Sequence, residues 1–408
     1  MKSLKLVLLI ICSTSVFAQE YTHFTETEGL VNNSVNCLTI ADNQNVWFGT
    51  NNGVSMFDGT NWMSYTVDVA PDMIDNRITA IYASSTGEIW IGTDNGINVF
   101  NGDSWSTYTE EDGLGDNRVS YINEDANGVI WVAEKDGLSK FNGSTWTSFG
   151  SQDGLPLGGL NYVTFDSTND LWLANSIFGM IHFDGTEFTT YNTSSGLVSN
   201  VVKAIAIDGN DNKWIGTAQG LTVFNATNEV VDHHTMMLLL PEPDTINPVV
   251  EIAFDSQGNV WTGIFVDYLV TVGGVAAWNG DSWTGFTDDE ELVGPVVRAL
   301  AIDANDAIWV ATSSGVTKIS EPVLSISQVY THSVMSVYPN PARSSFVVHS
   351  ENLIQSYKLV NLLGEVALES YSVNSNEFRV NSENLPSGLY IIDVLTTEGS
   401  IKKYVVVE

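Results

Sequence analysis

Short runs of alternating apolar and polar residues, separated by turns rich in glycine, asparagine and aspartate, fill residues 21–320. In residues 77–109 the runs RITAIYA, IWIGT, INVF and WSTYT are separated by SSTGE, DNG and NGDS. β-Branched and aromatic residues in such short runs favour strands, and the turn residues accept the positive φ that hairpins require. No helical period interrupts this pattern, so each unit is predicted to be four antiparallel strands.

The unit recurs seven times, and each copy places a tryptophan at the start of its second strand. The spacings between these tryptophans are 43, 41, 41, 42, 47 and 48 residues. Units of this length that stack radially bury their apolar faces against one another and form a β-propeller. A seven-bladed β-propeller is therefore predicted over residues 19–320, with its blades marked by Trp47, Trp90, Trp131, Trp172, Trp214, Trp261 and Trp309.

The seventh unit has three strands and no fourth, because no aromatic-x-x-aromatic segment follows Ile319. The missing segment is found at the start of the repeats, where YTHFT (21–25) has the pattern of a fourth strand. Aligned on Gly29, Tyr21 matches Trp105 and Phe24 matches Tyr108. We expect residues 21–25 to form the outer strand of the last blade and to close the ring, which also covers its open edge.

The two ends of the chain differ from the repeats. Residues 1–18 have the basic start, short apolar run and small-residue end of a signal peptide. The apolar run is too short for a bilayer, and no other stretch is long enough, so no transmembrane span is expected. Residues 337–408 contain six or seven short alternating strands, which predict a small β-sandwich after a linker at 321–336.

Charge is divided unevenly between these parts. Residues 19–324 carry 8 Lys and Arg against 41 Asp and Glu, a net charge of 8 − 41 = −33, whereas residues 325–408 carry 5 against 8, or −3. A strongly negative propeller repels polyanions, so nucleic acid is excluded as a partner and sulfated or uronic-acid glycans are disfavoured. Removal of the signal peptide leaves Cys37 as the only cysteine. A single cysteine excludes a disulfide framework, and we interpret Cys37 as a buried core thiol.

Strand order places the turn between strands two and three on the same face as the connection between blades; we call this the variable face, and its counterpart the opposite face. Turns of the opposite face are uniform, as in DANG and DGNDN, whereas long loops gather on the variable face. Function collects on variable loops of a rigid scaffold, so this face is the predicted binding face, although neutral drift of loop length is the alternative. The long segments are 67–76, 152–159, 176–179, 233–247 and 265–274.

A mostly polar position recurs near the start of each inner strand: Asn36, Thr79, Ser120, Asn161, Lys203, Val250 and Arg298. Polar groups there need water or a ligand, so a water-lined channel or a ligand site is predicted. Three further features complete the candidates: two arginines at equivalent strand entrances, a Glu in place of the usual Gly-Thr, and an Asp-Tyr pair in the longest loop of the sixth blade. The candidate ligand-binding residues are Arg77, Arg118, Glu134, Asn161, Lys203, Asp267, Tyr268 and Arg298.

Little in the sequence indicates catalysis. The propeller has four histidines, and none has a metal-ligand spacing with cysteine or carboxylates. Asp-rich turns such as 208–213 hint at Ca²⁺ but lack the glycine and distal glutamate of a loop site. No catalytic residue, metal or cofactor is therefore assigned, with Ca²⁺ kept as a minor alternative.

The repeat pattern (I/V)W(I/V)GT-x-x-G, followed by an aromatic residue before an N/D-G turn and by W-x-x-Y-T, resembles the two-component regulator propeller family. The resemblance is strongest at 47–53, 90–96 and 214–220, and weakest in the fourth and sixth units. In that family such repeats form the ligand-sensing ectodomains of bacterial hybrid sensor kinases and also occur in secreted proteins without a kinase. Because this chain has no kinase segment, the resemblance implies a ligand-binding scaffold and no signalling by the chain itself.

The C-terminal segment resembles the C-terminal sorting domain of the type IX secretion pathway of Gram-negative bacteria. The resemblance implies passage across the outer membrane by the type IX machinery, followed by removal of this domain and by surface attachment or release. An ordinary accessory sandwich is the alternative. The matching positions lie in YPNP, NLLGEV, LPSGLY and the lysine pair before the last strand: Pro339, Asn340, Pro341, Gly364, Gly388, Tyr390, Lys402 and Lys403.

These observations predict a secreted or cell-surface, non-catalytic propeller that binds an extracellular glycan, peptide or protein. A secreted propeller lyase or hydrolase is the first alternative, with His233 or His234 on the variable face. A structural adhesin that packs through its faces is the second.

Overall fold

The computed structural model describes residues 20–238, 247–265, 272–287, 291–320, 336–338, 340–361, 366–370, 373–383, 385–396 and 399–407. The chain divides into two compact units, Met1–Leu324 and Ser325–Glu408. The predicted signal peptide and all but the last residue of the predicted linker lie outside the described residues.

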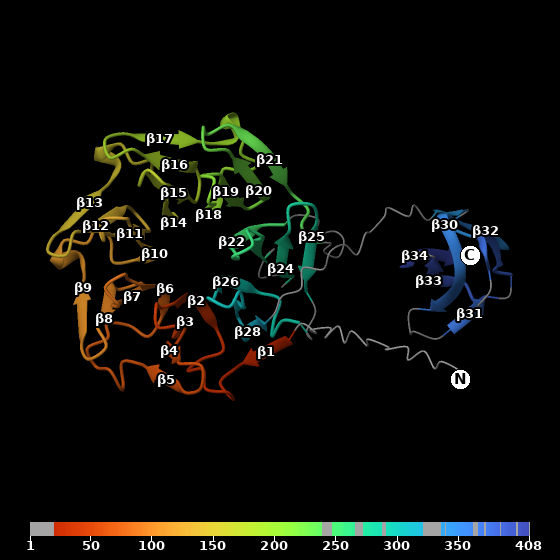
Figure 1. The fold of residues 1–408 in the computed structure, drawn as a ribbon, viewed down its shortest axis with the longest axis horizontal. Helices are drawn as coiled ribbons and strands as arrows, with labels where there is room; N and C mark the ends of the chain where they lie inside the picture. Colours follow the sequence, from red (N-terminus) through yellow and green to blue (C-terminus); the bar gives the residue numbers. More distant parts are fainter. Residues whose placement is uncertain are drawn as a thin grey trace, which may run out of the picture. The chain divides into compact units, whose positions relative to one another are not determined.

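The first unit is a seven-bladed propeller, and each blade is a four-stranded antiparallel sheet in which strands follow one another from the channel outward (Figure 1). Blades 1 to 3 consist of β2 (Val35–Ile40), β3 (Val46–Thr50), β4 (Gly53–Phe57) and β5 (Trp62–Tyr65); β6 (Ile78–Ala83), β7 (Ile89–Thr93), β8 (Ile97–Phe100) and β9 (Trp105–Tyr108); β10 (Val119–Glu124), β11 (Ile130–Glu134), β12 (Leu138–Phe141) and β13 (Trp146–Phe149).

Blades 4 to 6 repeat the arrangement, and single 3-10 turns precede three of the blades. The strands are β14 (Leu160–Phe165), β15 (Leu171–Asn175), β16 (Gly179–Phe183) and β17 (Phe188–Tyr191); β18 (Val202–Ile207), β19 (Lys213–Thr217), β20 (Gly220–Phe224) and β21 (Val230–His234); β22 (Val249–Phe254), β23 (Val260–Phe265), β24 (Gly273–Trp278) and β25 (Trp283–Phe286). The 3-10 turns are η1 (Glu110–Asp112), η2 (Ser151–Asp153) and η3 (Thr193–Ser195).

Blade 7 is completed by the start of the chain, as predicted. Its inner strands are β26 (Val297–Ile302), β27 (Ile308–Thr312) and β28 (Gly315–Ser320), and its outer strand is β1 (Glu20–Phe24). β1 pairs antiparallel with β28 from Glu20↔Ser320 to Phe24↔Val316, and the two lie side by side in Figure 1. The Phe24 ring stacks on Trp309 of blade 7 at 5.6 Å and also contacts Trp62 of blade 1 at 5.5 Å. The first strand therefore seals blade 7 and the junction with blade 1.

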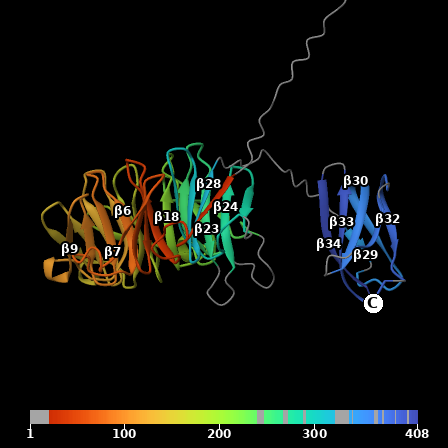
Figure 2. The same ribbon diagram turned by 90° about the horizontal axis from the view of Figure 1, so that it is seen from below.

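Seven apolar clusters hold the ring together, one at each junction between neighbouring blades. The repeated tryptophan belongs to these clusters: Trp261 in blade 6, for example, is fully buried beside Val297 and Leu300 of blade 7. Apolar area removed from water drives this packing, and large flat rings fill the wedge between two twisted sheets. Seen from the side in Figure 2, the strands of the propeller run between its two faces.

A repeated hydrogen bond ties the tryptophans to the turns of the opposite face. In five blades the indole N–H donates to the carboxylate of the aspartate six residues earlier, at 2.9–3.2 Å. The same carboxylate accepts backbone N–H groups of its own turn, so it orders the turn and satisfies the indole together. The pairs are Asp125–Trp131, Asp166–Trp172, Asp208–Trp214, Asp255–Trp261 and Asp303–Trp309.

The second unit is the predicted small β-sandwich, built as one six-stranded sheet that nearly closes on itself. Its longest strand pairs with β29 and β32 in its first half and with β31 and β33 in its second half, around a core that includes Phe346, Leu359 and Ile392. The strands are β29 (Ser336–Tyr338), β30 (Ser345–Asn361), β31 (Val366–Ser370), β32 (Ser375–Asn381), β33 (Gly388–Thr396) and β34 (Gly399–Val407).

Candidate ligand site in the propeller channel

A β-bulge near the start of every inner strand builds the mouth of the channel. In each blade the register of the first two strands shifts across one residue. A bulge re-aims the side chain of its extra residue. The seven bulge residues are the recurring polar position noted in the sequence, and all seven line the channel: Asn36, Thr79, Ser120, Asn161, Lys203, Val250 and Arg298.

Several of these side chains bind the neighbouring blade. The Asn36 amide donates to the carbonyl oxygen of Ile78 at 2.8 Å, and Thr79 and Asn161 make the equivalent bonds to Val119 and Val202 at 2.6 Å. Arg298 of blade 7 donates to Ser34 of blade 1 at 2.9 Å and to Asn36. The polar ring therefore links the blades as well as facing the lumen.

Below the mouth the channel opens into a cavity of about 480 Å³. Tyr121 and Tyr162 stack at 3.8 Å and occupy the side of blades 3 and 4. At the equivalent strand positions, blades 1, 2 and 7 have the small residues Cys37, Ala80 and Ala299. The free volume of the cavity therefore lies beside these three blades. The cavity falls within the size range of small-ligand sites.

Sequence reasoning missed this second ring of lumen residues. The bulge shifts the two-residue alternation, so the residue after each bulge faces the channel and the one after that is buried between blades. The missed residues are Tyr121, Tyr162 and Glu251. Cys37, interpreted as a core thiol, belongs to the same ring: it is half-buried and lines the cavity, and burial raises the pKa of its thiol.

The eight basic residues of the propeller fall into two groups. Lys140, Lys213 and Lys318 lie over tryptophan rings at 4.8–5.1 Å in the body of the blades. The other five lie on the variable face, at the start of an inner strand or at the turn after a second strand: Arg77, Arg118, Lys135, Lys203 and Arg298.

The two predicted strand-entrance arginines are paired with carboxylates. Arg77 is ion-paired with Asp94, and Arg118 is ion-paired with Asp116 at 2.7 Å and with Asp136. Arg77 lies at a second hollow of about 310 Å³ at the channel mouth, beside Asn51 and Arg298. Arg118 is not among the residues that line the channel cavity. The structure thus brings Asn161, Lys203 and Arg298 to one cavity, with Arg77 at its mouth, and leaves Arg118 outside it.

Glu134 is fully buried in blade 3, where four other blades have a threonine. Its Oε1 accepts the Gly115 N–H at 3.3 Å, whereas Oε2 has no hydrogen-bond partner among the described residues. Burial raises the pKa of this carboxyl to about 8. Gly115 and Gly137 separate it from a hollow of about 320 Å³ between blades 3 and 4. Glu134 therefore lies behind the variable face and does not reach the channel.

The remaining predicted residues are distributed as follows. Asp267 and Tyr268 lie outside the described residues, as do Pro339 and Gly364 of the sorting motif. Asn340 Oδ1 accepts the Val406 N–H at 2.8 Å, and the buried Tyr390 hydroxyl donates to the Pro386 carbonyl at 2.8 Å. The described motif residues are placed by the strands of the second unit. Asn340 and Pro341 lie between β29 and β30, and Gly388 and Tyr390 lie at the start of β33. Lys402 and Lys403 belong to β34.

No histidine lines the channel among the described residues. His233 and His234 end the outermost strand of blade 5, and His234 Nδ1 accepts the Trp283 indole N–H at 3.2 Å. Burial lowers the pKa of His234, and Asp232 acts in the opposite direction. This pair is therefore an outer-strand packing element and not part of the channel wall.

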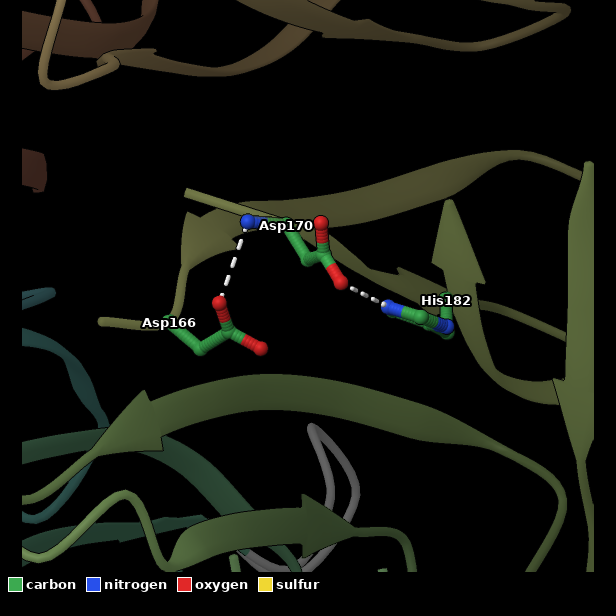
Figure 3. A group of neighbouring side chains, drawn as sticks. All are labelled: Asp166, Asp170 and His182. Atoms are coloured by element: carbon green, nitrogen blue, oxygen red, sulfur yellow. Dashed lines mark hydrogen bonds and ion pairs between the residues drawn. The ribbon is translucent and has the colours of Figure 1, made fainter. Parts of the chain in front are cut away.

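One side-chain group has the composition of a metal site: Asp166, Asp170 and His182 of blade 4 (Figure 3). The sequence spacing gave no sign of it, because His182 reaches Asp170, at 3.0 Å, from the neighbouring strand. Both Asp166 oxygens already accept hydrogen bonds, one from Trp172. His182 stacks on Trp172 at 4.4 Å. Both Asp166 oxygens, Asp170 Oδ2 and His182 Nε2 are thus already bonded within the scaffold.

Blade 7 shows the same contact with a lysine in place of histidine. Lys318 faces Trp309 across the strands, as His182 faces Trp172. It lies over that ring at 4.8 Å and pairs with Asp303 at 3.4 Å. In both blades a basic side chain lies on the blade tryptophan and contacts an aspartate near the same turn, and we assign the blade 4 group to this scaffold arrangement.

Family models match both units. Residues 29–52 and 72–95 match the two component regulator propeller, and residues 336–408 match the secretion system C-terminal sorting domain. Both resemblances drawn from the sequence are confirmed by these matches. The sorting domain indicates export to the cell surface or the medium. No curated protein matches the chain, and no described helix is both long and apolar enough to cross a bilayer.

Several solved structures share the fold at low sequence identity. PorZ, a surface component of the type-IX secretion system of Porphyromonas gingivalis, is 17% identical with a TM-score of 0.56, over 93% of this chain and 60% of PorZ. The extracellular domain of a proposed one-component system, BT4673 of B. thetaiotaomicron, is 15% identical with a TM-score of 0.61, over 96% of this chain and 59% of that one.

Virginiamycin B lyase from Staphylococcus aureus is 15% identical with a TM-score of 0.58, over 74% of this chain and 99% of the lyase. At such identities the likeness establishes the fold alone. The chain also spans only about 60% of the length of PorZ and of the BT4673 domain.

Proposed function

We propose that this protein is an exported, non-catalytic binding propeller that takes its ligand into the channel from the variable face. The observation that carries the proposal is the channel cavity of about 480 Å³, walled by the polar bulge residues and by a second ring that includes two stacked tyrosines. A few convergent polar groups in a concave, preformed cavity are the usual features of a small-ligand site.

Charge supports this assignment. In a propeller with a net charge of −33, five of the eight basic residues lie on the variable face. Lys203 is the most informative of them, because no described carboxylate pairs with it and burial lowers the pKa of its amine. An uncompensated, half-buried cation favours a ligand that brings a carboxylate or other acceptor oxygen.

Exposed apolar side chains also favour the variable face as the contact surface. Six of the eight large hydrophobic residues that are exposed in the described propeller lie there. Exposed apolar groups that collect on one face mark an interaction surface. The six are Val69, Leu157, Ile177, Phe178, Val201 and Met236.

A non-catalytic role is supported by the chemistry of the channel wall. Its titratable described residues are tyrosines, Cys37, Lys203, Glu251 and Arg298, without histidine or a group of carboxylates. A lyase or hydrolase needs a positioned acid and base or a metal, and His233 and His234 lie on the outermost strand instead. Type IX export places the propeller where extracellular glycans, peptides and proteins are its available ligands.

A ligand screen tests the proposal. Thermal shift and intrinsic fluorescence of the full chain are followed against oligosaccharides, short peptides and small polar metabolites, with wild type beside Lys203→Met and the matched control Lys140→Met. At least one class should raise the melting temperature of wild type and the control, and have a reduced effect on Lys203→Met. A response that Lys203→Met leaves intact, or no response from wild type, would count against the channel as the site.

A further inference from the structure

The chemistry of the cavity narrows the class of ligand, on the basis of the proposed function above. One basic and one acidic side chain line the same cavity: Lys203 on β18 and Glu251 on β22, in neighbouring blades. They are not paired with each other, and no other described charged group pairs with either. Buried or half-buried charges in proteins are normally paired. Lys203 has no described counter-charge. Glu251 keeps its proton at neutral pH unless a cation lies beside it.

Glu251 is surrounded by neutral neighbours. Its Oε1 accepts the Ile252 N–H at 3.3 Å, and the Tyr162 hydroxyl lies beside the carboxyl. Tyr121 stacks on Tyr162 at 3.8 Å, and Cys37 lies on the same ring. Burial raises the pKa of Glu251 to about 8, and burial also raises the pKa of both tyrosines and of the cysteine.

The position of Glu251 suits an ammonium group. A carboxylate beside tyrosine hydroxyls and aromatic faces supplies both the opposite charge and the π surface that organic cations prefer. The small residues Ala80 and Ala299, with Cys37, leave free volume at the same level of the channel. A cation that enters this volume would meet the carboxyl directly.

The position of Lys203 suits a carboxylate. Its amine is half-buried near the mouth, on the ring that also holds the Asn161 amide and Arg298. The Asn161 amide nitrogen donates to the Val202 carbonyl, and Asn161 and Lys203 both line the cavity. A charge-assisted hydrogen bond from a buried amine to a carboxylate is about twice as strong as a neutral one.

We infer that the channel takes a small zwitterion of the α-amino-acid class, with its carboxylate at Lys203 and its ammonium group at Glu251 and Tyr162. Both groups line one cavity, so one ligand can pair with the Lys203 amine and favour the ionised form of Glu251. The propeller has a net charge of −33, so its electrostatic field repels simple anions. A zwitterion has no net charge and is not repelled in this way.

Isothermal titration calorimetry on the full chain tests this inference with named probes: the individual α-amino acids, together with propionate and ethylamine as the separate halves. We expect at least one amino acid with a neutral side chain to bind about 30-fold or more tightly than either half. Lys203→Met and Glu251→Gln should each weaken binding by about 30-fold or more, because each removes one of two buried charge contacts.

Matched controls come from the same propeller. Lys140→Met removes a lysine that lies over Trp131, and Glu187→Gln removes an exposed glutamate from the turn between β16 and β17. Neither lies on the channel wall, so neither should change affinity. Affinity of the wild type should also rise between about pH 6 and pH 8 as Glu251 becomes ionised, and Glu251→Gln should lose that rise.

The outcomes separate this inference from the proposed function. Binding of ethylamine or of propionate as tight as that of the amino acids overturns the zwitterion and leaves the channel as the site. Binding of glycans or peptides alone, lost in Lys203→Met, has the same meaning. If no probe binds and the wider screen shows no dependence on Lys203, both the inference and the proposed function fail.

Discussion

On the opposite face of the propeller, five of seven blades carry the same aspartate, bound to the same tryptophan and to the same backbone N–H groups of its turn. On the variable face, the equivalent positions around the channel mouth differ from blade to blade: amide, hydroxyl, amine, guanidinium and, at Val250, an apolar group. Both faces are connected by the same strands, so the fold does not require this difference.

The contrast indicates which constraints act on each face. On the opposite face, one side chain must accept hydrogen bonds from an indole N–H and from several backbone N–H groups. Aspartate meets this requirement, so the same residue recurs from blade to blade. At the channel mouth the bulge fixes where a side chain points but leaves its chemistry free. The variable face can thus change its ligand without changing the scaffold, and the predictions below test that separation.

The largest effect is expected from removal of the strand that closes the ring. Deletion of residues 20–28 removes the five-residue pairing of β1 with β28 and leaves Trp309 and Trp62 without Phe24. Loss of a fully buried phenylalanine costs about 3–5 kcal/mol, and the half-buried Phe24 adds part of that cost to the loss of the whole strand. The midpoint of thermal unfolding should therefore fall by roughly 10 °C or more. Calorimetry of the deletion and of the single substitution Thr22→Ala, a mild control on the same strand, would measure this. A deletion variant that melts like the full chain would refute closure by β1.

The next effect tests the repeated turn of the opposite face. Asp255→Ala removes the acceptor of the fully buried Trp261 indole N–H, at 3.1 Å, and of two backbone N–H groups. An orphaned buried donor and the loss of bonds to a charged acceptor together cost about 3 kcal/mol. Urea denaturation should show that loss, whereas the exposed Asp281→Ala in the outer turn of the same blade should change the free energy of unfolding by under about 0.5 kcal/mol. Equal effects at the two sites would contradict a scaffold role for Asp255.

A pH-dependent effect is expected at Glu134. Burial raises its pKa to about 8 in the folded protein from the ordinary 4.5. Between these values the folded state holds a proton that the unfolded chain has released, so the free energy of unfolding falls as pH rises through this window. Glu134→Gln should remove up to about 5 kcal/mol of that fall, at 1.36 kcal/mol per pH unit. The similar contribution of Glu251, whose pKa burial also raises to about 8, should remain, and the exposed Glu187→Gln should leave the fall unchanged. Thermal melts at several pH values would measure the difference, and a wild-type slope that persists undiminished in Glu134→Gln would exclude this carboxyl as its source.

The smallest expected effect is an increase in the stability of the propeller, from a substitution in blade 2. Blade 2 has Ser84 where five blades have the aspartate, and the buried Trp90 indole N–H has no partner among the described residues. Ser84→Asp should supply the missing acceptor and stabilise the propeller by about 1 kcal/mol. Ser84→Ala, which supplies no acceptor for the indole, is the control and should give no gain in stability. A Ser84→Asp variant that is less stable than wild type would show that the turn of blade 2 differs from the other five.

The amino-acid sequence predicted the ring, its seven blades and the strand that closes it, because tryptophan spacing and two-residue alternation are local signals of a repeated unit. It also located the polar ring of the channel mouth. It did not reveal Glu251, Tyr121 and Tyr162, because a bulge changes the phase of the alternation and leaves no local mark in one sequence. It gave no sign of the ion pairs of Arg77 and Arg118 or of the His182–Asp170 contact, because these depend on side chains from adjacent turns and strands.

The central claim is that the channel of the variable face holds the ligand, and mass spectrometry of the natively secreted protein tests it most directly. Wild type, Lys203→Met and Lys140→Met are purified from the medium or cell surface, kept in their native state, and analysed for bound small molecules. The account predicts one class of bound molecule in wild type and Lys140→Met, and its loss or depletion in Lys203→Met. The same molecule at the same occupancy in all three proteins would contradict the channel as the binding site.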